Sequence, residues 1–327
     1  MTDFLESRPF RYTNVYLSIF ALFCFKLFVK ISLNILTHFY VVRGNRKEAA
    51  RIAAEFYDFG HGPRSWADRS PLHEAACQGR LLSLRTLLSQ GYNPNIITID
   101  HVTPLHEACL GDHVACARAL IAAGANVNAN TIDGVTPLYN ACSAGSATCA
   151  EVLLEHGATP QAEHCKPSPI HEATSKGHAA CVEALLAWGA DVDYVIPHLG
   201  SPLYIACVRQ ELQCTRALLH GGANVQQGHF LETPLHAAAQ KDCTEVIKVL
   251  LEFGANINAK NSEQKRPVET APPSGSAEGL LLLHEATPQS LLQLCRLGIR
   301  DHMGRSRHHL INQLKLPTLL KKFLQYR

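Results

Sequence analysis

The chain has 327 residues, of which 46% are hydrophobic and 18% are charged, and this composition is ordinary for a globular protein. Its net charge of +2 is too balanced for charge alone to indicate a nucleic-acid-binding protein. The 12 cysteines do not indicate a disulfide framework, because the chain is long and no cleavable signal peptide is apparent, so we expect reduced thiols in a cytosolic protein.

An apolar stretch lies near the N-terminus, at residues 15–42. Its 28 mostly apolar residues could span a bilayer, and a basic segment at residues 43–51 follows as a cytoplasmic flank would. However, Lys26 and Lys30 fall within the stretch, and each would cost about 2.5–3.5 kcal/mol at the centre of a membrane. Two interpretations of residues 1–66 therefore stay open: membrane association with the rest of the chain in the cytosol, or a helix that caps the repeats.

A six-residue motif recurs through the middle of the chain. It reads SPLHEA, TPLHEA, TPLYNA, SPIHEA, SPLYIA and TPLHAA, and its prolines are Pro71, Pro104, Pro137, Pro169, Pro202 and Pro234. These prolines are 33, 33, 32, 33 and 32 residues apart, and a weaker copy places Pro267 another 33 residues on. A second apolar stretch and a glycine follow each of the six copies. This period and motif resemble the ankyrin repeat, which implies a solenoid of stacked helix pairs.

The second copy illustrates the physical basis of the repeat. Thr103 is a favourable N-cap for a helix that starts at the proline after it, and Leu105 and Ala108 then face the interior. We expect Gly111, just past this short helix, to adopt a positive φ. A second helix is predicted at about residues 114–123. Neither helix is long enough to be stable alone, so stability has to come from stacking.

The repeat and its flanks define the expected domains. We predict an all-α protein in which residues 67–270 form an ankyrin-repeat α-solenoid with β-hairpin-like fingers. The repeats fall at about residues 68–97, 101–130, 134–163, 166–195, 199–228 and 231–260, with a degenerate seventh from residue 264. Residues 271–279, which read APPSGSAEG, are predicted to be a linker. A small three-helix module is expected at residues 280–327.

Histidine and cysteine residues occupy fixed positions in the repeat. Successive copies place His73, His106, His171 and His236 at one position, Cys116, Cys149, Cys181 and Cys214 at a second, and Cys109, Cys142 and Cys207 at a third. Such ladders are typical of scaffold positions, and small buried cysteines suit the gap between paired helices. A zinc site would need four convergent ligands. We therefore expect no metal site and no cofactor.

The sequence contains no recognisable catalytic motif. The patterns G-x-S-x-G, G-x-x-x-x-G-K and H-E-x-x-H are all absent. A non-catalytic role in protein binding is therefore expected, since ankyrin stacks bind proteins along a concave surface of fingers and inner helices. The candidate substrate contacts are residues at the fingers that depart from the repeat consensus: Asp100, His101, Asp133, His198 and Glu232.

The tail segment SLLQLCRLGIR, residues 290–300, has an unusually wide apolar arc. On a helical wheel this arc holds Leu291, Leu292, Leu294, Cys295, Leu297 and Ile299, while Gln293, Arg296 and Arg300 share the remaining side. The arc is roughly twice the ~100° stripe of a helix that buries one side. We therefore expect this helix to have two burial partners.

The spacing Leu291-x-x-x-Cys295-x-x-x-Ile299 resembles the elongin-binding box of the SOCS box. This resemblance implies that Leu291, Leu294, Cys295 and Ile299 contact elongin C. Further on, the segment LPTLLKKFLQY resembles the cullin-binding half of the SOCS box. There the resemblance implies cullin contacts for Leu316, Pro317, Leu320 and Phe323. The family often has a second proline where this chain has Leu319.

Residues 68–327 as a whole resemble the family of ankyrin-repeat and SOCS-box proteins. The resemblance implies the substrate-recognition subunit of an E3 ubiquitin ligase, which binds a target protein for ubiquitination and proteasomal degradation. The implied partners are elongin B, elongin C, the fifth cullin with its RING partner, and an unknown protein substrate. The alternative is an ankyrin interaction scaffold that recruits no ligase. We expect the basic residues of the tail to form a solvated helical face, not a nucleic-acid groove.

Overall fold

The computed structural model describes residues 69–161, 167–287, 289–303, 311 and 313–326. Contacts divide the chain into two compact units, residues 1–126 and 127–327. The apolar stretch at residues 15–42 lies outside the described residues. Within the part of the chain that the structure describes, no helix has both the length and the apolar character needed to cross a membrane.

The first unit contains two described helix pairs. The pairs are α3 (Pro71–Cys77) with α4 (Leu81–Ser89), and α5 (Pro104–Leu110) with α6 (Val114–Ala122). The first helix of each pair packs on the first helix of the other, and the second on the second. The sequence predicted this arrangement of stacked pairs.

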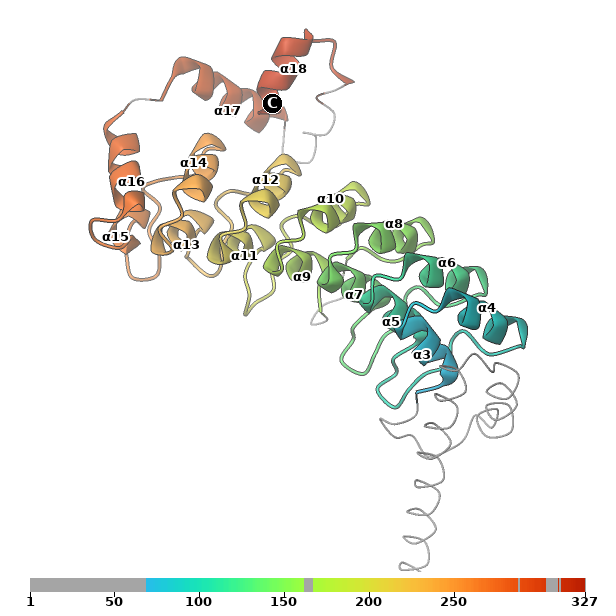
Figure 1. The fold of residues 1–327 in the computed structure, drawn as a ribbon. Helices are drawn as coiled ribbons and strands as arrows, with labels where there is room; N and C mark the ends of the chain where they lie inside the picture. Colours follow the sequence, from blue (N-terminus) through green and yellow to red (C-terminus); the bar gives the residue numbers. More distant parts are fainter. Residues whose placement is uncertain (1–68, 162–166, 288, 304–310, 312, 327) are drawn as a thin grey trace, which may run out of the picture. The chain divides into compact units, whose positions relative to one another are not determined.

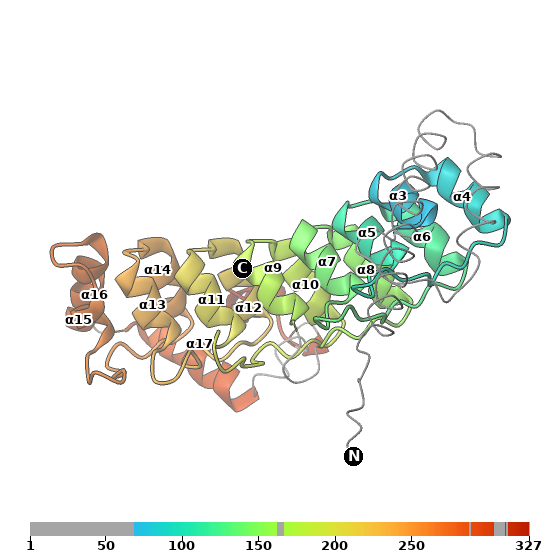
Figure 2. The ribbon, with the colours of Figure 1, turned by 90° about the horizontal axis from the view of Figure 1, so that it is seen from below.

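The second unit continues the pattern. Its helices are α7 (Pro137–Ala144), α8 (Ala147–Glu155), α9 (Pro169–Ser175), α10 (Ala179–Ala187), α11 (Pro202–Arg209), α12 (Leu212–His220), α13 (Pro234–Gln240), α14 (Thr244–Glu252), α15 (Pro267–Thr270), α16 (Ser276–Ala286), α17 (Leu291–Met303) and α18 (Thr318–Leu324). Helices α7, α9, α11 and α13 form an inner row, and α8, α10, α12 and α14 form an outer row (Figure 1). Figure 2 shows α15 and α16 at the end of both rows. The predicted all-α solenoid is confirmed.

The Ser/Thr–Pro pairs start the inner helices as the sequence predicts. At α5, the hydroxyl of Thr103 accepts a hydrogen bond from the backbone N–H of His106, and the imidazole of His106 accepts one from the backbone N–H of Thr103. This reciprocal arrangement is a capping box with histidine in the place usually taken by Glu or Gln. The same pair of bonds joins Ser70 and His73 at α3.

The prediction of a positive φ at Gly111 is wrong. Its φ is −85°, and the left-handed residue is the next one, Asp112, with a φ of 55°. Gly111 is required instead by a close approach, because a Cβ there would lie 2.7 Å from the ring of His113. That ring is held by a 2.9 Å hydrogen bond between its Nε2 and the carbonyl oxygen of Cys77.

Two ladders of aliphatic side chains form the core. Leu72, Leu105, Leu138, Ile170, Leu203 and Leu235 are fully buried on the inner helices, and Leu84, Leu120, Leu153, Leu185, Leu218 and Leu250 on the outer helices. Burying each such side chain contributes about 1.5–3 kcal/mol relative to exposure. The cysteines predicted to be structural are buried among them: Cys109, Cys116, Cys142, Cys149, Cys181, Cys207 and Cys214.

Helix α16 begins inside the stretch that the sequence predicted as a linker. Ala277 and Leu281 on this helix are buried, and α16 packs on α14 and α15. The backbone N–H of Ala277 also donates to the carboxylate of Asp242, at 2.6 Å. Helix α16 therefore stands where the outer helix of the degenerate seventh repeat is expected.

Candidate functional site

Helix α17 presents most of its apolar arc to solvent, although Leu297 is half-buried. Leu291 is 77% exposed, Leu294 is 51% exposed and Ile299 is 42% exposed. Cys295, between them on the same arc, is exposed as well. These are the four residues that the sequence assigned to elongin C. Only one of the two burial partners expected for this helix is thus supplied by the chain itself.

The polar side of α17 faces inward, toward the last complete repeat. The amide of Gln293 donates to the backbone carbonyl of Glu252 at the end of α14. The guanidinium of Arg296 lies over two rings, with its carbon 4.1 Å from the centroid of Phe323 and 4.3 Å from that of Tyr326. Such cation–π contacts contribute about 0.5–2 kcal/mol each, depending on their desolvation.

Arg300 is buried, unlike the other charged side chains of the tail whose burial the structure describes. Its guanidinium is buried, donates a 2.8 Å hydrogen bond to the carbonyl oxygen of Leu324, and lies within 5.3 Å of the ring centroids of Phe253 and Tyr326. Burial lowers the pKa of Arg300 below its ordinary value. The arginine thereby fastens α17 to the end of α18 and fixes which side of α17 remains exposed.

The residues assigned to the cullin are either exposed or half-buried. Pro317 caps α18 at its start, and both it and Leu320 are exposed. Leu316 is half-buried. Phe323 is also half-buried, because the guanidinium of Arg296 covers its ring. The structure therefore leaves Pro317 and Leu320 more accessible to a partner than Phe323.

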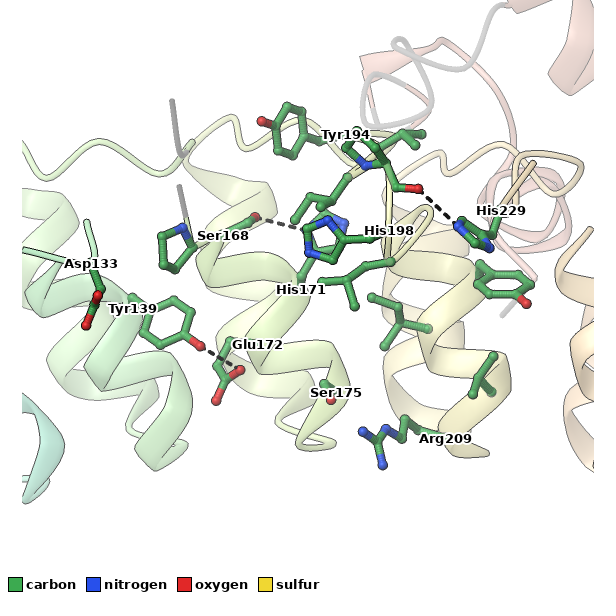
Figure 3. Close-up of a pocket in the computed structure, with 18 residues that line it drawn as sticks. Asp133, Tyr139, Ser168, His171, Glu172, Ser175, Tyr194, His198, Arg209 and His229 are labelled. Carbon is green, nitrogen blue, oxygen red and sulfur yellow. Dashed lines mark hydrogen bonds between the residues drawn. The ribbon is translucent and has the colours of Figure 1, made fainter. Parts of the chain in front are cut away.

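A groove of about 770 Å³ lies between the fingers and the inner helices of the second unit (Figure 3). Its lining comes from several successive repeats: Asp133, Tyr139, Pro167, Ser168, His171, Glu172, Ser175, Tyr194, Val195, Ile196, Pro197, His198, Leu199, Tyr204, Ile205, Val208, Arg209 and His229. Val195 and Leu199 are 40% and 42% exposed in one finger, whose ends are joined by a bridge between Ile196 and Gly200. The groove is thus an open, largely apolar surface.

Two tyrosines form the walls of this groove. Tyr139 and Tyr204 occupy the motif position that four other repeats give to histidine. The hydroxyl of Tyr139 donates to the Oε2 atom of Glu172 at 2.9 Å, and that of Tyr204 donates to the Oε2 atom of Glu232 at 2.8 Å. Burial and the bond to Glu172 raise the pKa of Tyr139 to about 12. Both hydroxyls therefore stay protonated, and both rings are held in place while remaining half-exposed.

The histidines at the same position have a structural role. The Nε2 atom of His73 lies 2.9 Å from the carbonyl oxygen of Val102, and those of His171 and His236 lie 3.1 Å from the carbonyl oxygens of Gly200 and Lys265. Each imidazole therefore ties its own inner helix to the finger of the following repeat. Among the described residues, no three or more His, Cys, Asp or Glu side chains converge as metal ligands would.

The predicted substrate contacts are not all in one place. Asp133 and His198 line the groove. Glu232 lies beside it, as the acceptor for Tyr204. Asp100 and His101 are exposed at a finger of the first unit. Sequence reasoning missed Tyr139, Tyr204, Val208 and Arg209, although the replacement of histidine by tyrosine in the motif was a visible signal for the first two.

Comparison with known families identifies both parts of the chain. Residues 72–164, 125–196 and 170–261 match the family of ankyrin repeats in three copies, and residues 287–325 match the SOCS box. The chain is 73% identical over 324 residues to ankyrin repeat and SOCS box protein 5 of Bos taurus, with 98% of each chain covered. It is 54% identical to ankyrin repeat and SOCS box protein 11 of Mus musculus over 325 residues, which cover 98% of this chain and 100% of that one.

Solved structures show the same fold. The crystal structure of the human ASB11 ankyrin repeat domain matches with a TM-score of 0.65 and 53% identity, over 68% of this chain and 100% of that one. The ankyrin repeat domain of Bcl-3 matches with a TM-score of 0.57 and 29% identity, over 66% of this chain and 99% of that one.

Proposed function

Because this chain belongs to the family of ankyrin repeat and SOCS box proteins, we propose that it is the substrate-recognition subunit of an elongin–cullin–SOCS-box E3 ubiquitin ligase. In this role the ankyrin repeats bind a target protein, and the tail recruits elongins B and C together with the fifth cullin and its RING partner. The chain itself makes and breaks no bond. It raises the effective concentration of the target near the ubiquitin-carrying enzyme, and the target is then degraded by the proteasome.

The exposed apolar arc of α17 is the observation that carries this proposal. An isolated leucine on a protein surface needs no explanation, but Leu291, Leu294 and Ile299 lie on one arc of one helix. The polar residues of the same helix are turned inward, where Arg296 and Arg300 contact aromatic rings. A helix whose arginines pack inward while its leucines stay exposed has an apolar surface suited to binding a second protein.

The rival function is an ankyrin scaffold whose tail packs within the chain and recruits no ligase. The tail does pack on the last complete repeat, through Gln293, Arg296 and Tyr326. This packing uses the polar side of α17 and the aromatic residues near the end of the chain. It leaves exposed the four residues assigned to elongin C, which are called the elongin arc below. The structure therefore favours the ligase role over the scaffold role.

The proposed location is the cytoplasm, where the elongins and the cullin would be met. Membrane association through residues 15–42 is a second proposal, and it rests on the apolar sequence of that stretch and on the basic segment after it. In either case the ankyrin repeats would face the cytosol.

Co-expression of the full chain with elongins B and C tests the function. We expect the three proteins to purify together in equal amounts. Leu291→Ala removes a side chain from a filled interface and should cost about 2–5 kcal/mol of binding, by analogy with buried leucine truncations. Cys295→Asp should be more damaging, because it would bury an unpaired charge.

The matched control is Leu82→Ala, since Leu82 is 65% exposed on α4, far from the tail in sequence. This variant should retain both elongins. If the unaltered chain purifies without elongins B and C when they are co-expressed with it, the ligase role is rejected in favour of the scaffold role.

A further inference from the structure

We propose that the groove of the second unit binds an extended segment of a partner polypeptide, with apolar side chains packed against Tyr139 and against Tyr204 and an acidic side chain paired with Arg209. The inference rests on the proposed function, because such a segment would be the recognition signal of the substrate. It specifies which kinds of side chain the substrate presents to the groove, which the presence of ankyrin repeats alone does not define.

The apolar part of the signal follows from the walls and floor of the groove. The rings of Tyr139 and Tyr204 are half-exposed, and Val208 lies on the inner helix α11 between the fingers and Arg209. Val195 and Leu199 add exposed apolar surface from the finger above. Aromatic and branched side chains gathered in this way bury an apolar side chain of a partner favourably.

The tyrosines are also held in place before any partner binds. Glu172 accepts hydrogen bonds from Tyr139 at 2.9 Å and from the hydroxyl of Ser143 at 2.8 Å, and Glu232 accepts one from Tyr204 at 2.8 Å. Because both rings are anchored at their far ends, little conformational freedom is lost when a partner packs against them. Rigid aromatic walls of this kind are typical of protein-binding surfaces.

The acidic part of the signal follows from the charges around the groove. Among the described residues that line the groove, Arg209 is the one with a Lys or Arg side chain, and it is exposed at the end of α11. It forms no ion pair with any described residue. The two lining carboxylates lie elsewhere: Glu172 is occupied by Tyr139 and Ser143, and Asp133 lies on the opposite side of the groove (Figure 3). A carboxylate on the partner is the complement that Arg209 lacks.

The extended conformation follows from the spread of the lining. Asp133 precedes α7 and His229 follows α12, so an occupant that reaches both sides crosses several repeats. An extended chain advances about 3.3 Å per residue, against 1.5 Å in a helix, so it spans the groove with fewer residues. Repeat proteins bind their partners on extended concave surfaces of this kind.

A displayed library of random twelve-residue peptides tests the proposal. The library is selected on the purified full chain and, separately, on the Arg209→Glu variant. The unaltered chain should enrich peptides with an aromatic or aliphatic residue at a fixed spacing from Asp or Glu. The Arg209→Glu variant should enrich Lys or Arg at that same spacing. Absence of an Asp or Glu preference, or a preference that the charge reversal leaves unchanged, overturns the proposal.

Synthetic peptides from the selection then give affinities. A peptide selected on the unaltered chain should bind the Arg209→Glu variant at least fivefold more weakly. The matched control is Arg216→Glu, which makes the same charge change on the outer helix α12 and should leave the affinity unchanged. Tyr204→Ala should also weaken binding, whereas Tyr204→Phe keeps the ring and should bind nearly as well. If Tyr204→Ala does not fold, Val208→Asp replaces it, with loss of binding expected.

The same preparations separate this inference from the proposed function. Arg209→Glu should still purify with elongins B and C, and Leu291→Ala should still bind the selected peptide. Peptide binding without elongins would reject the ligase role and leave the groove assignment standing. Elongin binding without any selected peptide would reject the groove assignment and leave the ligase role standing.

Discussion

The ring of Tyr326 stacks on the ring of Phe253, with centroids 3.9 Å apart and planes 20° from parallel. Tyr326 is the second-last residue of the chain, and Phe253 directly follows α14. The Tyr326 hydroxyl also donates to the carbonyl oxygen of Glu252, at 2.9 Å. The C-terminus is thereby fastened to the last complete repeat, and α17 is enclosed between them on its polar side.

Tyr326→Ala should loosen the tail without unfolding the repeats. The variant loses an aromatic pair worth about 0.5–1.5 kcal/mol beyond its buried area, together with cation–π contacts to Arg296 and Arg300. Amide hydrogen exchange in α17 should therefore rise about tenfold, while exchange in α7 to α12 stays the same. Leu319→Ala is the control, because Leu319 is 83% exposed. Unchanged exchange in α17 would show that the stacking is not what holds the tail.

Replacing Leu316 and Pro317 together by alanine should separate the two halves of the tail. Pro317 sets the start of α18, whereas the elongin arc lies on α17. Elongin binding should therefore persist while cullin recruitment weakens. Pull-downs probed for both partners measure this. Equal loss of elongin in this variant and in Leu291→Ala would mean that the tail folds as one unit.

The stability of the repeats should fall on acidification. Burial lowers the pKa of His73 and of His171 to about 4, against about 6.5 in an unfolded chain. Between pH 6.5 and pH 4 the unfolded chain therefore binds more protons, so stability present above pH 6.5 is lost as the pH falls toward 4. Each histidine contributes up to about 1.4 kcal/mol per pH unit in this window. Urea midpoints at several pH values measure the slope.

His73→Gln should reduce that slope between pH 7 and pH 5 and leave the part that His171 contributes. Gln is neutral throughout this window and is the usual residue at this position of a capping box, so it can still reach the N–H of Ser70. His101→Gln at an exposed finger is the control and should keep the slope of the unaltered protein. A slope that survives His73→Gln in full would assign the acid sensitivity to other groups.

Deleting residues 1–42 tests the membrane proposal. The apolar stretch and its basic flank are the motivation, and the deletion removes the stretch. If the stretch anchors the chain, the truncated protein should move fully to the soluble fraction after cell fractionation. Full-length protein that is already soluble at moderate salt would instead favour a helix that caps the first repeat.

The positions of the inner helices could be predicted from the sequence because a Ser/Thr–Pro pair marks the start of the inner helix in each of the six repeats. Thr103 with its proline marks the start of α5, and the structure begins the helix there. The left-handed residue after α5 could not be predicted in the same way. Gly111 resembles a helix-ending glycine, but it lacks a side chain because the ring of His113, the N-cap residue of α6, occupies that space. The positive φ is found at Asp112 instead.

The helical wheel of α17 gave its two sides but not which side faces inward. Periodicity groups Leu291, Cys295 and Ile299, and it opposes them to Arg296 and Arg300. Ordinary burial rules would turn the leucines inward. The opposite happens because three aromatic rings lie over the guanidiniums: Phe253 directly after α14, Phe323 in α18 and Tyr326 near the end of the chain. Such a surface depends on segments far apart in sequence, and no local pattern reveals it.

The bonds from His171 to Gly200 and from His236 to Lys265 bear on how these repeats can be recombined. Each bond joins a histidine side chain of one repeat to a backbone carbonyl oxygen of the next. Because every residue has such a carbonyl, the bond can form whichever residue follows at that position. A chimera that cuts the chain just before a Ser/Thr–Pro pair keeps every such bond on both sides of the junction. Whole repeats could therefore be exchanged between two relatives. Such an exchange would transfer a groove from one receptor to another without redesigning the histidine–carbonyl bonds at the junction.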